Sequence, residues 1–125
     1  MTYIYPASQS EYTAALGLAR SESERISRAT SAPEEMPGDA RYYLTADLQS
    51  GFGVAADGAL IGLFSTVQGR GDDLITDAVT HKGATHLDCF DGYLPGLYKR
   101  HGFIETERVP NWVSGEPDVV FMALR

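Results

Sequence analysis

The sequence has 125 residues, of which 43% are hydrophobic and 22% carry a charged side chain. This length and balance suit a single folded domain and exclude a wholly disordered chain. The formal net charge of −7 disfavours nucleic acids and anionic membrane surfaces as partners.

Several function classes are disfavoured by single features of the sequence. One cysteine, Cys89, rules out a disulfide within the chain. No apolar run approaches the ~20 residues of a membrane-spanning helix. The N-terminus has no signal-peptide pattern, so we expect a cytoplasmic protein. His81, His86 and His101 lack a second ligand at metal-binding spacing, so we expect no metal site.

The first third of the chain predicts a strand and a helix. Residues 2–6 are aromatic and β-branched, which favours a strand. Ser8 or Ser10 then suits a helix N-cap, and apolar residues recur at roughly helical spacing from Glu11 to Arg28. Two prolines and a glycine make residues 30–38 a loop.

The central segment predicts a hairpin. Residues 39–49 fit either a short helix or a strand. Phe52–Ala56 and Ala59–Val67 read as strands around Asp57-Gly58, the preferred dipeptide of a two-residue hairpin turn. Only these two strands are secure between residue 50 and the glycine-rich segment that follows.

A glycine-rich break, Gln68-Gly69-Arg70-Gly71, separates the second hairpin strand from a helix that begins at Asp72 and Asp73 and ends near Gly83. The remaining elements are a strand, a helix, a strand, a loop with Trp112, and an apolar strand, at Thr85–Phe90, Leu94–His101, Phe103–Val109, Pro110–Pro117 and Val119–Leu124. The order predicts one α/β (α+β) domain spanning residues 1–125.

The break at Gln68–Gly71 suits an anionic ligand. Glycines let backbone amides approach a ligand closely, and the free N–H groups of a helix's first turn favour an anion such as a pyrophosphate. The segment lacks the Lys-Ser/Thr of a P-loop and the three-glycine dinucleotide fingerprint. A tight strand-to-helix connection is the simpler alternative.

Two motifs together resemble those of the GNAT acyltransferases. Gln68-Gly69-Arg70-Gly71 resembles that family's Gln/Arg-x-x-Gly-x-Gly/Ala turn, and the stretch Leu94–Phe103 resembles its short helix with a tyrosine followed by Gly-Phe. The resemblance covers roughly residues 51–124, and the pattern from Gly83 to Met122 is also similar to GNAT-like proteins of phage and bacterial genomes.

The resemblance implies a fold and a co-substrate. The fold would be a mixed, mostly antiparallel sheet with helices on both faces and splayed central strands. The co-substrate would be acetyl-CoA, with its pyrophosphate held by the segment from Val67 through Gln68, Gly69, Arg70, Gly71 and Asp72 to Asp73. GNAT domains frequently dimerise through their sheets, but the sequence leaves the oligomeric state open.

The resemblance also implies acetyl transfer to an amine by direct attack. A backbone amide near the end of the strand 59–67 would polarise the thioester carbonyl, and Tyr98 would protonate the departing thiolate. Asp88 and Asp91 are the candidate bases, although water serves that role in some enzymes of the family. The sequence names neither the amine nor the acyl group.

Two departures from the family favour an alternative. Asp73 stands where the family has Gly or Ala, and with Asp72 it places negative charge beside the expected pyrophosphate, which Arg70 could offset. The scarcity of secure strands before the turn predicts a reduced sheet. The alternative is a GNAT-fold protein that has lost catalysis and acts by binding, such as a phage-encoded regulator.

Two further side chains have structural interpretations. Cys89 lies in an apolar strand and is expected to be a small buried hydrophobe. Trp112 could line an acceptor pocket, but we expect it to cover the core.

Overall fold

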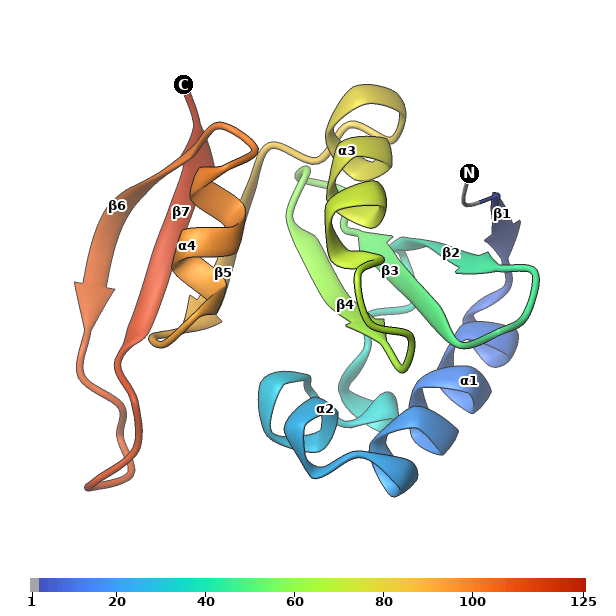
Figure 1. The fold of residues 1–125 in the computed structure, drawn as a ribbon, viewed down its shortest axis with the longest axis horizontal. Coiled ribbons are helices and arrows are strands. Elements are labelled where there is room, and N and C mark those ends of the chain that lie inside the picture. The colour runs from blue at the N-terminus through green and yellow to red at the C-terminus, as the bar shows by residue number, and fades with distance from the viewer. Residues whose placement is uncertain (1–2) are drawn as a thin grey trace. The chain divides into compact units, whose positions relative to one another are not determined.

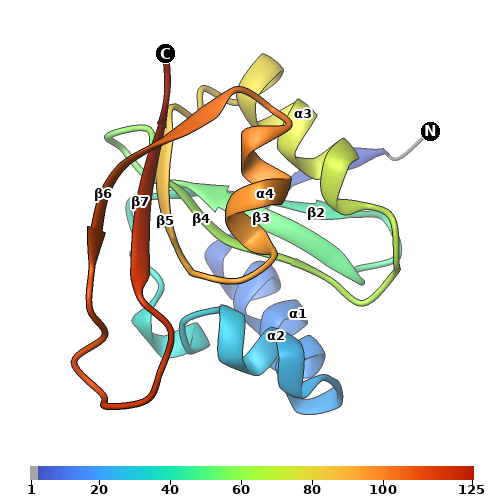
Figure 2. The same ribbon diagram turned by 60° about the vertical axis from the view of Figure 1, so that its left-hand side comes forward.

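The computed structural model describes residues 3–125, and it divides the chain into two compact units, Met1–Ala84 and Thr85–Arg125. No helix in that described range is long and apolar enough to cross a membrane. Each unit is built around its own antiparallel sheet (Figures 1 and 2). The prediction of one domain over residues 1–125 stays a prediction.

The sheet of the first unit has the order β1-β2-β3-β4, with every neighbouring pair antiparallel. The strands are β1 (Ile4–Ala7), β2 (Arg41–Thr45), β3 (Ser50–Val54) and β4 (Leu60–Ser65). Before and between them lie α1 (Gln9–Glu22), α2 (Glu24–Ala29) and the 3-10 turn η1 (Pro33–Glu35), and α3 (Gly71–His81) follows β4.

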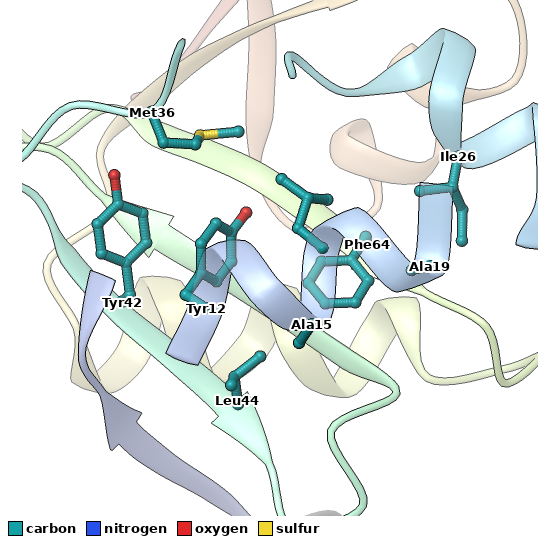
Figure 3. Close-up of a cluster of buried hydrophobic side chains, with 9 residues drawn as sticks. Tyr12, Ala15, Ala19, Ile26, Met36, Tyr42, Leu44 and Phe64 are labelled. Atoms are coloured by element: carbon teal, nitrogen blue, oxygen red, sulfur yellow. The ribbon is translucent and has the colours of Figure 1, made fainter. Parts of the chain in front are cut away.

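Helices cover both faces of this sheet (Figure 2). One face packs against α1, where Tyr12 stacks on Tyr42 with 4.5 Å between ring centroids and Phe64 meets Tyr12 edge-on at 5.9 Å. Figure 3 shows this cluster, which also includes Leu16, Ile26, Met36 and Leu44. The other face packs against α3, whose Leu74, Ile75 and Ala78 are fully buried.

The predicted helix over 11–28 is divided in two by Ser23. Its side chain accepts a hydrogen bond from the Ile26 amide while its own amide donates to the Ala19 carbonyl, so Ser23 ends α1 and caps α2. At the start of α1, Ser8 and Glu11 form a reciprocal capping box.

The segment 39–49 contains a strand, and the sheet before the turn is therefore not reduced. Tyr42 and Leu44 belong to the α1 cluster, whereas Tyr43 packs on Phe52 with 5.3 Å between ring centroids. Because β2 is buried on both faces, it lacks the alternation of polar and apolar residues that identifies a half-buried strand.

The hairpin turn is longer than predicted. The Gly58 amide donates to the Ala55 carbonyl, and the Ala55 amide donates to the Ala59 carbonyl. Gly58 has φ +92. The connection is therefore the longer type of hairpin loop, which ends in a left-handed glycine. The predicted two-residue turn would also need a positive φ at Asp57.

The second unit has a sheet of order β5-β7-β6, formed by β5 (His86–Phe90), β6 (Phe103–Val109) and β7 (Val119–Leu124). The helix α4 (Leu94–Lys99) contacts β5 and β6 (Figure 1). Its first turn carries Pro95, whose fixed φ suits that position. The buried core of this unit consists of Leu87, Tyr98, Phe103, Val120 and Met122, with Val119 and Pro95 beside them.

The α/β (α+β) class with antiparallel sheets is confirmed, and the helices of the first unit lie on both faces of its sheet. The splaying of central strands stays a prediction.

Candidate functional site

The predicted turn begins as β4 ends. The hydroxyl of Ser65, the last residue of β4, donates a hydrogen bond to the Val67 carbonyl at 2.7 Å and accepts one from the Val67 amide at 3.1 Å. This local ring of bonds turns the chain out of the strand. Gly69 then adopts φ +88, a left-handed conformation that favours glycine.

The start of α3 presents backbone amides that no side chain caps. Arg70 is the N-cap residue and makes no side-chain capping bond, since a guanidinium cannot accept one. Within residues 3–125, no hydrogen bond occupies the backbone N–H groups of Gln68, Gly69 or Gly71. A Cβ placed on Gly69 would meet nothing within 4 Å, so the approach to the turn is open. These features suit an anion.

Two carboxylates oppose this suitability. Asp72 and Asp73 lie in the first turn of α3, and both residues are exposed. Acids at this position stabilise a helix through its dipole. They also lie in the same helical turn as amides that would bind a pyrophosphate, and the effect of their charge on such a ligand stays a prediction.

Arg70 does not turn its charge toward the open side of the turn. Its Nη2 lies 2.7 Å from Asp47 Oδ2 and its Nη1 lies 3.0 Å from Asp47 Oδ1. The Nη1 group also donates to Ser50 Oγ at 2.9 Å. The guanidinium therefore binds the connection between β2 and β3.

A bulge interrupts β4 ahead of the turn. Gly51 pairs with Phe64 and Gly53 pairs with Ile61, so Gly62 and Leu63 together face Phe52. A bulge of this kind leaves backbone groups outside the ladder.

Tyr12 secures this bulge from α1. Gly62 has φ +57, and its carbonyl accepts a hydrogen bond of 2.6 Å from the buried Tyr12 hydroxyl. Burial raises the pKa of Tyr12, so the hydroxyl stays a donor at neutral pH.

The candidate acid, Tyr98, is buried in α4 with 6% of its surface exposed. Its ring meets Phe103 edge-on, with 5.8 Å between centroids. Burial raises the pKa of the Tyr98 hydroxyl, and the neighbouring groups Cys89, Tyr93 and Asp88 raise it further. The phenol is therefore protonated at neutral pH and can donate a proton.

The two candidate bases have different surroundings. Asp91 Oδ2 lies 2.7 Å from Arg108 Nη1, and the hydrogen bond from Arg108 lowers the pKa of Asp91. A carboxylate held in this way is a weaker base. Asp88 lies exposed on β5, paired with Phe121 of β7, and makes no ion pair within the described part of the chain.

Arg108 also binds Glu105 at 2.9 Å and Asp118 at 3.5 Å. It therefore links β6 to the ends of β5 and β7, and its ion pairs are structural.

Other predicted side chains have simple surroundings. Cys89 is half-buried, and desolvation raises its pKa to about 11, which keeps it a protonated thiol rather than a nucleophilic thiolate.

Trp112 is 83% exposed, so the prediction that it covers the core is wrong. Over the part of the chain that is described, no His, Cys, Asp and Glu side chains gather into a group that could hold a metal ion.

The predicted site residues fall in both units. The turn from Val67 to Asp73 belongs to Met1–Ala84, whereas Asp88, Asp91 and Tyr98 belong to Thr85–Arg125. Sequence reasoning did not identify Asp47, which holds Arg70, or Tyr12, which holds the bulge. Asp47 shows only the ordinary signature of a turn residue, and Tyr12 that of an apolar helix face.

The sequence matches no family model and no curated protein. Solved structures match it in fold. A protein from Lactobacillus plantarum assigned as an N-acetyltransferase aligns with a TM-score of 0.63 and 20% identity, over 98% of this chain and 97% of its own.

Two chimeras of spermidine N-acetyltransferase SpeG from Vibrio cholerae with hSSAT align with TM-scores of 0.61 and 0.58, at 12% and 11% identity. Each alignment covers 98% of this chain and 94% of the other. Similarity at these identities is a similarity of fold. The chain therefore has the fold of the GNAT N-acetyltransferases, as its two motifs predicted.

Proposed function

We propose that this protein is an acyl-CoA-dependent N-acyltransferase that moves an acetyl group from acetyl-CoA to an amine. The observation that carries the proposal is the open turn at Gln68–Gly71, with its unbonded amides at the start of α3, in a chain with the N-acetyltransferase fold. Fold alone does not determine chemistry, so the local geometry of this turn is what supports the proposed activity.

The turn would hold the pyrophosphate of acetyl-CoA through backbone groups. The amides of Gln68, Gly69 and Gly71, reinforced by the dipole of α3, are the binding groups. The segment from Val67 to Asp73 forms this subsite, with Asp72 and Asp73 on its rim. Because Arg70 is bonded to Asp47, binding would rely on amide dipoles rather than on a cationic side chain.

The bulge in β4 is the proposed source of the amide that polarises the thioester carbonyl. The Tyr12 hydroxyl donates a hydrogen bond to the Gly62 carbonyl, and this bond fixes the backbone of the bulge. A backbone amide that is held in place before the reaction stabilises developing negative charge at no cost in reorganisation.

Tyr98 would act as the general acid. The amine nitrogen forms a bond to the thioester carbonyl carbon as the carbon–sulfur bond breaks. Tyr98 gives its hydroxyl proton to the departing sulfur, and the amine nitrogen loses a proton to Asp88, to Asp91 or to water. Tyr98 then recovers a proton from solvent. The raised pKa of Tyr98 keeps its hydroxyl protonated at neutral pH.

The acceptor is proposed as an amine with a neutral attacking nitrogen and positive charge on another nitrogen. A net charge of −7 attracts such a molecule to the protein. Spermidine is the substrate in the name of the SpeG chimeras that share this fold, which makes it the first amine to test.

The test is incubation of the protein with acetyl-CoA and a panel of amines that begins with spermidine. We expect release of free thiol together with an amine that gains one acetyl group by mass. Thiol release without acetylated amine would indicate hydrolysis and would contradict amine transfer.

Exposed Asp72 and Asp73 favour a second candidate, a GNAT-fold binding protein without catalysis. Titration of an Asp73→Gly variant with acetyl-CoA separates the two. Binding by this variant but not by the wild type would mean that the carboxylate has removed co-substrate binding, and the second candidate would then hold.

A further inference from the structure

The connection between β2 and β3 is organised around the Asp47 carboxylate. Its Oδ1 accepts hydrogen bonds from Thr45 Oγ1 at 2.7 Å and from the Gln49 amide at 3.0 Å. The next residue, Leu48, has φ +62, the positive φ that a tight connection requires. Asp47 is therefore fixed within its own loop before it meets Arg70.

Arg70 reaches this loop from the start of α3 and joins it through both ends of its guanidinium. Both Asp47 oxygens accept from Arg70, at 2.7 and 3.0 Å, and this two-point geometry constrains orientation as well as distance. Nη1 also donates to Ser50 Oγ at 2.9 Å and contacts Thr45 Oγ1 at 3.4 Å.

The hydroxyls in this network are inside the protein. Ser50 is 0% exposed and Thr45 is 3% exposed, so their partners cannot easily be replaced by water. The Asp47 carboxylate is 37% exposed, so the buried hydroxyls of Ser50 and Thr45 supply the part of the network that is shielded from water. The Arg70 side chain is consequently held at its far end by this part of the first sheet.

The backbone of Arg70 lies between Gly69 and Gly71, the two glycines of the proposed pyrophosphate turn. Glycine loses more conformational freedom on ordering than any other residue, so a turn with two of them needs an external restraint. The Arg70 side chain provides such a restraint between the two glycines.

We propose that Asp47 is a positioning residue, which clamps Arg70 so that the amides of the Gln68–Gly71 turn are held ready for a pyrophosphate. The inference rests on the proposed function, because it assigns this clamp to co-substrate binding. Asp47 itself contacts no ligand in this scheme.

A competing role for Arg70 makes the opposite prediction. If the guanidinium bound phosphate directly, loss of Asp47 would release it and acetyl-CoA would bind equally well or more tightly. If Asp47 positions the turn, its loss leaves the amides disordered and binding weakens. The direction of the change therefore distinguishes the two roles.

The experiment measures two quantities on wild type and Asp47→Asn. One is the affinity for acetyl-CoA by calorimetry, and the other is the NMR order parameter of the Gly69 and Gly71 amides without ligand. Asp47→Glu tests rescue of the carboxylate. Glu24→Gln is the matched control, since it breaks an exposed 2.7 Å ion pair with Arg28 that lies outside the turn and its network.

We expect Asp47→Asn to weaken acetyl-CoA binding about tenfold. The order parameters should fall from about 0.85 toward about 0.6. Asp47→Glu should recover part of both, and Glu24→Gln should change neither. Unaltered or tighter binding by Asp47→Asn would overturn the inference.

Failure of the proposed function has a different signature. If wild type does not bind acetyl-CoA, the acyltransferase proposal fails, and the order parameters alone test whether Asp47 positions the turn. Lower order parameters in Asp47→Asn would support positioning of the turn for another ligand, and unchanged order parameters would overturn the positioning role.

Discussion

Tyr98 is the side chain on which the proposed chemistry depends. Tyr98→Phe keeps the ring that packs against Phe103 and removes only the proton donor. We expect kcat to fall by about 100-fold or more, which is the usual contribution of a general acid, while acetyl-CoA affinity stays the same. Steady-state kinetics and calorimetry on the same samples check this. Equal turnover by variant and wild type would remove Tyr98 from the mechanism.

Gly62 combines a positive φ of +57 with close packing. A Cβ at this position would overlap the Tyr12 hydroxyl. We expect Gly62→Ala to lower the free energy of unfolding by about 1–3 kcal/mol through strain and loss of the Tyr12 hydrogen bond. Denaturant unfolding measures the change.

Gly17→Ala is the matched control for that substitution. Its Cβ would meet Pro33 at 3.6 Å, an ordinary contact, and alanine is favoured by about 0.5–1 kcal/mol inside a helix. If both variants shifted stability in the same direction and by the same amount, strain at Gly62 would not be the cause.

The capping box of α1 sets where that helix begins. Ser8→Ala removes the side-chain acceptor of the Glu11 amide, and we expect a loss of about 1 kcal/mol in the free energy of unfolding. Ser10 was the alternative cap in the sequence, and in the structure it lies inside α1. Ser10→Ala should therefore change stability little. An equal loss of stability in Ser8→Ala and Ser10→Ala would contradict the assignment of Ser8 as the N-cap of α1.

The link between the β2–β3 connection and the start of α3 should make stability sensitive to acid. The hydrogen bonds from Arg70 and then Thr45 lower the pKa of Asp47 in the folded chain. Its contribution is therefore complete above the unfolded pKa of about 4 and is lost as the pH falls through the folded pKa.

Asp47→Asn removes this titration. We expect its free energy of unfolding to fall less steeply than that of wild type between about pH 5 and about pH 2. If the free energies of unfolding of the two proteins fell equally steeply over this pH range, the ion pair would not persist in solution.

Elements with a local signal were predictable from the sequence. β6 and β7 have the predicted bounds, and the helix at α3 follows its glycine break. Tertiary contacts decide what the sequence left open at residues 39–49 and what it missed within residues 11–28. β2 is recognised only through burial on both faces, and Ser23 breaks a helix whose apolar spacing continues across it.

The whole molecule was predictable as a fold but not as a working site. Two motifs in the right order predicted an N-acetyltransferase fold, and solved structures covering nearly the whole chain bear this out. The anchoring of Arg70 was not predictable, because Asp47 and Arg70 lie far apart in sequence and either could have faced solvent.

Calorimetric titration of wild-type protein with acetyl-CoA is the most direct test of the proposed co-substrate site. We expect saturable binding of one molecule per chain, with a dissociation constant in the range of about 1 μM to 1 mM that is usual for enzyme substrates. Absence of binding across that range would contradict it, because the open turn at Gln68–Gly71 would then not be a coenzyme A site.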